Sequence, residues 1–197
     1  MTTVLLTGFE PFDGQEVNAS WAAVREVAAG WDAEAEGATL VTALLPVSFA
    51  RAPGALDALL AEHAPDLVVA VGEAGGRSAV SVERVGLNVQ DARIPDEDGA
   101  QPVDSPVVAD GPAAYFSTLP VKACLAAVLA ADVPGEVSST AGTYVCNTLA
   151  YVVGDRLAAG AGAPGARGGF VHVPRLPEQV ADGAASLAAD RAGAGLA

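Results

Sequence analysis

The sequence predicts an α/β protein, a three-layer α/β/α sandwich with a mixed, largely parallel sheet. Short apolar segments of strand length alternate with segments of helical periodicity along the whole chain. Residues 66–71 (DLVVAV) are apolar at every position after the aspartate, a pattern typical of a parallel strand that is covered on both faces. Because the chain has 197 residues, we expect a single domain over residues 1–197.

The elements follow in order. The other predicted strands are rich in β-branched and apolar residues and end at glycine, proline or polar residues. They cover residues 4–7, 39–45, 78–89, 135–139 and 170–173. The predicted helices have apolar residues at helical spacing or a high alanine content, with glycine or proline beyond several of their ends. They cover residues 19–29, 55–63, 121–131, 143–159 and 178–191.

The segments between these elements are irregular, and several are candidates for a functional site. Residues 8–18 (GFEPFDGQEVN) are too rich in glycine, proline and acids to be regular, and they present Phe9 and Phe12. Residues 72–77 form a predicted turn at the carboxyl end of a strand, where ligands bind in open α/β sheets. Residues 91–119 form a proline-rich loop of a length that is usually functional.

Composition excludes several classes of function. The chain has 10 basic and 24 acidic residues, a net charge of −14 and a pI near 4.2, so its surface repels nucleic acids and anionic membranes. No apolar stretch approaches the 18 residues of a membrane span, and the first residues lack the basic region of a signal peptide. We therefore expect a cytoplasmic protein that contacts neither nucleic acid nor membrane.

Few residues or motifs in this sequence could bind a metal or an organic cofactor. Two cysteines supply neither a disulfide framework nor a thiolate zinc cluster. The Gly72 to Gly76 turn lacks the GxGxxG spacing of a dinucleotide site, and no GxxxxGK[ST] motif is present. We expect no metal and no organic cofactor.

Histidine and cysteine are few, which narrows the candidates for nucleophilic chemistry. His63 ends a predicted helix beside Pro65, where an imidazole can cap the last carbonyls. Cys124 lies on the apolar stripe of a predicted helix and reads as an inert core thiol. Cys146 falls at about the third position of a helix with Thr143 as its N-cap, where the helix dipole stabilises a thiolate. A small core residue also suits that position, and both interpretations stay open.

A second group makes the nucleophile interpretation more specific. His172 lies one residue before the end of a predicted strand, and an imidazole beside a helix-start thiol is a cysteine-nucleophile arrangement. Such a site needs a carboxylate to orient the imidazole. Glu83 shares a strand face with Val85 and Leu87, so its buried carboxylate needs a partner. That partner is either a histidine or an arginine in a purely structural ion pair.

Seven segments together resemble pyroglutamyl peptidase I, the pyrrolidone-carboxylate peptidase family. They are residues 8–12 (GFEPF), 76–88 (GRSAVSVERVGLN), 91–96 (DARIPD), 110–123 (DGPAAYFSTLPVKA), 140–147 (TAGTYVCN), 170–174 (FVHVP) and 177–179 (PEQ). The resemblance runs in order from residue 4 to about residue 180. Each fragment is weak alone, but the ordered set is highly specific.

The resemblance implies a cysteine omega-peptidase that removes N-terminal pyroglutamate from peptides. The catalytic Glu, Cys and His of the family correspond to Glu83, Cys146 and His172. Cys146 would attack the pyroglutamyl carbonyl and form a thioacyl enzyme, His172 would transfer the proton, and Glu83 would orient the imidazole. The resemblance also implies a homo-oligomer, a dimer or a tetramer.

The resemblance places further residues in the substrate pocket. Phe9, Phe12 and Tyr144 would sandwich the lactam ring, and the Tyr144 hydroxyl must then find a partner. Asn18 and the turn containing Glu73 would meet the lactam amide, although a carboxylate so close to the thiol opposes its ionisation. Arg93 would lend electrostatic support.

Two other functions fit parts of the pattern. One is a catalytically weak lactam-binding or regulatory module on the same fold, against which the retention of all three triad positions argues. The other is a different Cys-His amidase, such as a glutamine amidotransferase. The amidotransferase fits worst, because Cys146 lacks a small-residue nucleophile elbow and the Glu-Cys-His order differs.

Overall fold

The computed structural model describes residues 1–197 and places six strands in one central sheet. These strands are β1 (Thr2–Phe9), β2 (Ala38–Leu45), β3 (Leu67–Ala74), β4 (Val80–Glu83), β7 (Gly135–Ser138) and β8 (Arg167–Pro174). Their order is β2-β1-β3-β8-β4-β7, and every neighbouring pair is parallel except β4 and β8. The prediction of a mixed, largely parallel sheet is confirmed.

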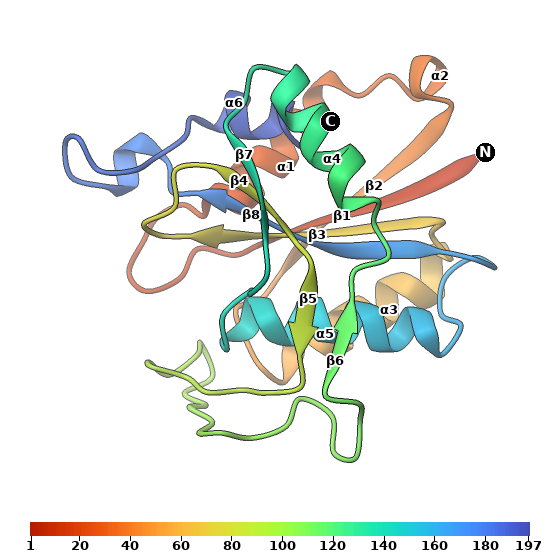
Figure 1. Cartoon of the computed structure of the whole chain (residues 1–197), viewed down its shortest axis with the longest axis vertical. Coiled ribbons are helices and arrows are strands. Elements are labelled where there is room, and N and C mark those ends of the chain that lie inside the picture. Colours follow the sequence, from red (N-terminus) through yellow and green to blue (C-terminus); the bar gives the residue numbers. More distant parts are fainter.

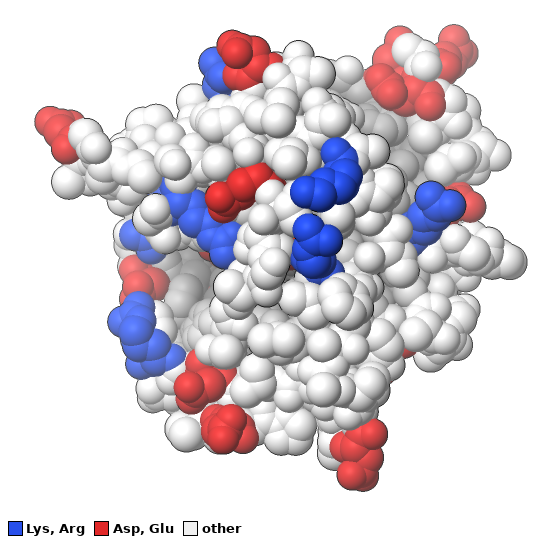
Figure 2. Space-filling view, viewed as in Figure 1, with Lys and Arg blue, Asp and Glu red and all other residues white.

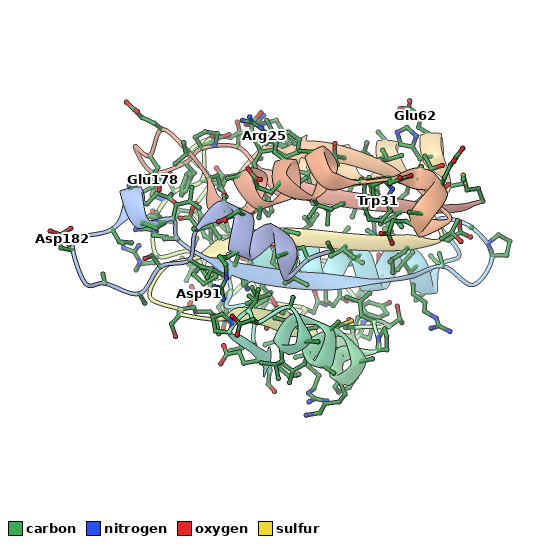
Figure 3. All side chains as sticks on the ribbon, turned by 90° about the horizontal axis from the view of Figure 1, so that it is seen from above. Arg25, Trp31, Glu62, Asp91, Glu178 and Asp182 are labelled. Carbon is green, nitrogen blue, oxygen red and sulfur yellow. The ribbon has the colours of Figure 1, made fainter.

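Helices cover both faces of this sheet, which gives the predicted three layers (Figure 1). They are α1 (Ala19–Gly30), α2 (Ala33–Glu36), α3 (Arg51–His63), α4 (Val121–Ala130), α5 (Val145–Ala158) and α6 (Ala189–Ala194), with a 3-10 turn, η1 (Pro177–Gln179). One apolar core lies between the sheet and α3 and α5, and a second between the sheet and α1, α4 and α6. Figure 3 looks from above onto the face of the sheet that α1, α4 and α6 cover.

The predicted strand over residues 78–89 is wrong as a single element, because the chain divides it at Arg84. The first part is β4 of the main sheet, and the second is β5 (Val85–Leu87), which pairs antiparallel with β6 (Ala114–Phe116). Gly86 explains the departure: a Cβ there would lie 2.4 Å from the backbone nitrogen of Tyr151, so β5 packs directly on the backbone of α5. The predicted loop over residues 91–119 therefore contains one short strand, β6, which belongs to this small sheet.

The start of α5 also differs from the prediction. The helix begins at Val145, and its N-cap Tyr144 makes no side-chain cap hydrogen bond. The Thr143 hydroxyl, the predicted cap, donates instead to the carbonyl of Asp91 at 2.8 Å. Cys146 is therefore the second helical residue of α5 and not the third.

Two further boundaries matter for the site. Gly72 and Glu73, predicted in a turn, lie inside β3 because this strand stays paired with β8 up to Ala74. The predicted helix over residues 178–191 is wrong: only η1 and the short α6 form. Gly183, with φ +79, breaks any continuous helix there, and Figure 3 shows Asp182 on an extended loop.

The remaining sequence predictions concern isolated residues and charge. His63 ends α3, but it caps no carbonyl; the helix closes through Ala64 (φ 41), whose N–H donates to the Leu60 carbonyl. Cys124 is half-buried in α4, and burial raises the pKa of its thiol.

Figure 2 shows acidic side chains around the rim of one face. No helix combines the length and apolar character that a membrane span requires.

One motif escaped the sequence analysis. Residues 160–165 (GAGAPG) have the GxGxxG spacing. They follow α5 and precede β8, whereas a dinucleotide-binding turn follows a strand and opens a helix. The segment is therefore a connection and not a phosphate site.

Candidate active site

Cys146 lies where the first turn of α5 meets the middle of the sheet. A Cβ atom added to Gly72 of β3 would lie 2.8 Å from the Cys146 sulfur, so the thiol sits directly over this glycine. The side chain is half-buried, and the N–H groups of a first helical turn lack partners within the helix. The sulfur therefore faces the sheet beside backbone N–H groups of α5 that have no partner within the helix.

His172 lies on the same face of the sheet as the thiol. It is the register partner of Gly72 in the parallel pair of β3 and β8, and such partners project to the same side. Phe170, two residues earlier on that face, packs edge-on against the imidazole at a centroid distance of 4.9 Å. A Cβ on Gly72 would also touch the Phe170 ring, so imidazole, ring and thiol surround the same glycine.

Glu83 holds the imidazole from the next strand, β4. Its Oε1 lies 2.8 Å from Nδ1 of His172 and accepts a second hydrogen bond from Nη1 of Arg77 at 2.7 Å. Glu83 is 1 % and His172 4 % exposed. With a proton on Nδ1 shared with the carboxylate, Nε2 is the nitrogen that can accept another. Both partners that the sequence left open, a histidine and an arginine, are present.

The protonation of these groups is set mainly by burial. Burial raises the pKa of Cys146 to about 12, and the charges of Glu73 and Glu83 act in the same direction. Burial also lowers the pKa of His172. For Glu83, burial acts to raise the pKa, but the interactions with His172, Ser138 and Arg77 outweigh it and the pKa is lowered. Burial thus opposes the dipole-stabilised thiolate that the helix start predicts, and it favours a neutral thiol beside a neutral imidazole and an ionised carboxylate.

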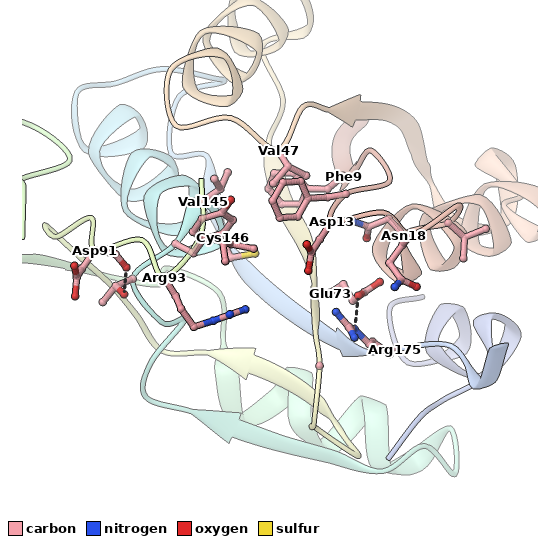
Figure 4. Close-up of a pocket in the computed structure, with 17 residues that line it drawn as sticks. Phe9, Asp13, Asn18, Val47, Glu73, Asp91, Arg93, Val145, Cys146 and Arg175 are labelled. Carbon is pink, nitrogen blue, oxygen red and sulfur yellow. Dashed lines mark hydrogen bonds and ion pairs between the residues drawn. The ribbon is translucent and has the colours of Figure 1, made fainter. Parts of the chain in front are cut away.

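A cavity of about 340 Å³ opens beside Cys146 at the carboxyl edge of the sheet (Figure 4). All six residues that the family resemblance placed in the substrate pocket line it: Phe9, Phe12, Asn18, Glu73, Arg93 and Tyr144. Its volume falls within the usual range of small-molecule sites. The structure therefore brings together residues that are up to 135 positions apart in the sequence (9 to 144).

An aromatic wall forms one part of this cavity. The rings of Phe12 and Tyr144 lie 5.8 Å apart at an interplanar angle of 37°. Phe49, which the sequence analysis missed, supports Tyr144 from behind at 5.1 Å, edge to face. The Tyr144 hydroxyl finds its expected partner in the Pro95 carbonyl, to which it donates at 2.9 Å.

Glu73 and Asn18 form the opposite, polar part. Glu73 accepts from the Ala19 N–H at 2.9 Å, from Nε2 of Gln179 at 2.8 Å and from Nε of Arg175 at 2.9 Å. Asn18 caps α1, accepting from the Ser20 N–H. Both polar side chains are therefore fixed before any ligand arrives.

The loop that carries Arg93 is tied to the start of α5. The Asp91 N–H donates to the Thr143 carbonyl at 2.9 Å, the Thr143 hydroxyl donates back to Asp91, and Tyr144 holds Pro95. Arg93 points from this loop toward the cavity (Figure 4) and makes no ion pair. Its guanidinium is therefore free to meet a ligand.

The sequence of this chain matches proteins of one family. The family profile of the pyroglutamyl peptidases matches residues 2–197. The pyrrolidone-carboxylate peptidase of Streptomyces coelicolor is 58 % identical over 186 residues, which cover 94 % of this chain and 83 % of that protein. The chain belongs to the pyroglutamyl peptidase family.

Other relatives agree with this membership. The pyrrolidone-carboxylate peptidase of Clavibacter michiganensis is 55 % identical over 91 % of this chain and 81 % of its own length. The crystal structure of Bacillus amyloliquefaciens pyroglutamyl peptidase I superposes with a TM-score of 0.91 at 40 % identity, covering 100 % of this chain and 93 % of that one. The chain is thus a cysteine peptidase of this family, as the resemblance of its motifs implied.

Three residues around this pyroglutamyl peptidase site were missed by the sequence analysis: Arg77, Arg175 and Phe49. A buried Glu83 signalled the need for a second donor, and Arg77, six residues upstream, was the nearest arginine before it. Arg175 pairs with Glu73 across 102 positions, and no local pattern in the sequence announces such a contact.

Proposed function

We propose that Cys146, His172 and Glu83 hydrolyse the amide bond after an N-terminal pyroglutamyl residue, within one peptidase domain over residues 1–197. The observation that carries this is the buried Glu83–His172 pair on the sheet face that the Cys146 thiol approaches over Gly72. An oriented imidazole beside a thiol is the arrangement that nucleophilic catalysis by cysteine requires.

The raised thiol pKa of about 12 favours a mechanism in which deprotonation accompanies attack. Nε2 of His172 takes the thiol proton while the sulfur bonds to the pyroglutamyl carbonyl carbon. The proton then passes from Nε2 to the leaving amine as the C–N bond breaks, which leaves a pyroglutamyl thioester on Cys146. A water molecule, deprotonated by the same nitrogen, attacks the thioester; pyroglutamic acid leaves and the thiol is restored.

The surrounding groups stabilise charge during these steps. The Glu83 carboxylate fixes Nδ1 and offsets the positive charge that the imidazole gains. Backbone N–H groups at the start of α5 stand near the sulfur and would bind the oxyanion of the tetrahedral intermediate. Arg93 adds electrostatic support from the cavity wall.

The cavity suits an uncharged lactam. Phe9, Phe12 and Tyr144 supply flat apolar walls for the ring. Glu73 Oε1 accepts one hydrogen bond, from Arg175, and retains capacity for the lactam N–H, while Asn18 lies near the same edge. A prolyl ring lacks the lactam carbonyl and would leave polar groups unpaired, which is how such a site rejects it.

The natural setting is also a proposal. We expect peptides with N-terminal pyroglutamate as substrates, in a cytoplasm that keeps the two free thiols reduced. We also expect a homo-oligomer, a dimer or tetramer, as the resemblance to the family implies. Light scattering during size-exclusion chromatography measures the mass of the protein directly. A monomer at micromolar concentration would contradict the expected dimer or tetramer.

The first experiment follows release of p-nitroaniline from its pyroglutamyl amide, with wild type and Cys146→Ala and with prolyl p-nitroanilide as the control. Turnover of the pyroglutamyl compound by wild type alone is expected. Thermal melts establish that both proteins are folded. A folded, reduced wild type without turnover overturns the peptidase proposal, and calorimetric binding of 2-pyrrolidone then tests the lactam-binding module.

A further inference from the structure

Arg77 contacts the proposed catalytic groups from outside the substrate cavity. It follows the Gly75–Gly76 turn after β3, and its side chain is 25 % exposed. Nη1 donates to Glu83 Oε1 at 2.7 Å, and Nη2 donates to the Thr140 carbonyl at 3.0 Å. One guanidinium thus connects a buried carboxylate to the segment that leads into α5.

The two contacts lie on the two halves of the site. Glu83 Oε1 is the same oxygen that holds Nδ1 of His172, and Oε2 has no hydrogen-bond partner. Thr140 lies six residues before Cys146, in the chain segment between β7 and α5. The planar fork of arginine can hold both acceptors at once, which a flexible ammonium group cannot do as well.

We propose that Arg77 is a positioning residue that joins the Glu83–His172 pair to the segment carrying Cys146. This inference rests on the proposed function of these three residues. Arg77 does not line the cavity, and its side-chain hydrogen bonds go to Glu83 and Thr140, so it acts through Glu83 and through the Thr140 segment.

The charge of Arg77 acts on all three groups in the same direction. It lowers the pKa of Glu83, of His172 and of Cys146. Two carboxylates from other elements, Glu73 of β3 and Glu83 of β4, raise the pKa of the thiol. His172 of β8 faces the thiol beside Gly72, and Arg93 and Arg175 line the same cavity. Arg77 is thus the cation that opposes two carboxylates at the nucleophile.

Its loss should disturb the proton distribution more than the fold. Without Arg77, the buried Glu83 carboxylate keeps its hydrogen bond to His172 but loses its arginine partner, and a buried charge with less compensation favours proton uptake. The proton would reside on the imidazole, and a protonated His172 cannot accept the proton of the thiol. We therefore expect a loss in kcat with little change in KM.

The test uses a Cys124→Ala background, so that Cys146 is the single thiol, and compares Arg77→Met, Arg77→Lys and the control Arg25→Met on the exposed face of α1. The readouts are kcat and KM on the pyroglutamyl p-nitroanilide and the pH dependence of Cys146 alkylation by iodoacetamide. For Arg77→Met we expect kcat to fall about 10- to 100-fold, the worth of a charge-assisted hydrogen bond, with the alkylation midpoint at higher pH. Arg25→Met should match the background protein in both readouts.

Arg77→Lys separates charge from geometry. It should keep the alkylation midpoint near that of the parent, while kcat stays reduced because one ammonium cannot hold both acceptors. Parental kcat in folded Arg77→Met, or in Arg77→Lys if the methionine variant does not fold, overturns the proposal. If the parent itself lacks turnover, the proposed function fails, and an unmoved alkylation midpoint in the folded variant then overturns the role of Arg77 separately.

Discussion

Gly72 leaves the space that the Cys146 sulfur occupies. A Cβ atom at Gly72 would lie 2.8 Å from Sγ and 2.7 Å from Cζ of Phe170. Gly72 has no positive φ, so glycine is required by the close approach of neighbouring atoms and not by the backbone conformation. The thiol can reach the face that bears His172 because β3 has no side chain at this point.

Gly72→Ala should therefore inactivate the enzyme while leaving a weakened fold. Displacing the sulfur by about 1 Å from its attacking position costs about 100-fold in kcat/KM, and forcing a methyl group into a filled site costs about 1–3 kcal/mol of stability. Activity and urea denaturation are measured together. Gly54→Ala is the matched control, because a Cβ there meets nothing within 4 Å on an exposed part of α3. Parental activity in Gly72→Ala would contradict the assigned position of the thiol.

Glu73→Gln should make the Cys146 thiol more acidic. The Glu73 charge is the largest cause, after burial, of the raised thiol pKa, and glutamine keeps an acceptor for the Ala19 N–H. The pH midpoint of iodoacetamide alkylation should move downward. Glu62→Gln, at the exposed end of α3, serves as the control with the same change in charge. An unmoved midpoint would mean that the Glu73 charge does not raise the pKa of the thiol, because Arg175 already neutralises it.

Tyr144→Phe should raise KM more than it lowers kcat. The ring would still pack between Phe12 and Phe49, but the loop would lose its hydrogen bond at Pro95. A hydrogen bond of about 0.5–1.5 kcal/mol corresponds to roughly a 2- to 10-fold change. Steady-state kinetics on the pyroglutamyl p-nitroanilide measure both constants. Tyr115→Phe removes a comparable hydroxyl contact, to Asp155, and should change neither.

Strand and helix order could be predicted because it depends on local periodicity, and each predicted strand of the main sheet forms. The failures have local physical causes that periodicity does not record. Alternation continues from 80 to 87, yet the chain leaves the sheet at Arg84 because Gly86 packs on α5. Alanine-rich residues after Pro177 have helical propensity, but Gly183 at positive φ and the absence of a continuous apolar stripe prevent one long helix.

The candidate site was predictable in its members and not in its electrostatics. Cys146 and His172 could be proposed from their places at a helix start and a strand end, and Glu83 from its place on an apolar strand face, where the family resemblance then supported it. The position of Cys146 at a helix start predicted a lowered thiol pKa. Burial and the charges of Glu73 and Glu83 raise this pKa instead. Arg77 and Arg175 contribute through tertiary contacts, which a single sequence does not specify.

The pH dependence of stability tests the buried His172–Glu83 pair without an activity assay. Burial lowers the pKa of His172 below its ordinary value of 6.5, and that of Glu83 lies below 4.5. Below about pH 6.5 the unfolded chain therefore binds more protons than the folded one, so the free energy of unfolding falls as the pH falls. The Glu83 contribution is present above 4.5 and is lost as the pH falls through its lower folded value. Urea denaturation at pH 7.5 and 5.5 should show a larger loss for wild type than for His172→Gln, which retains His63. Equal losses would contradict a buried, neutral His172.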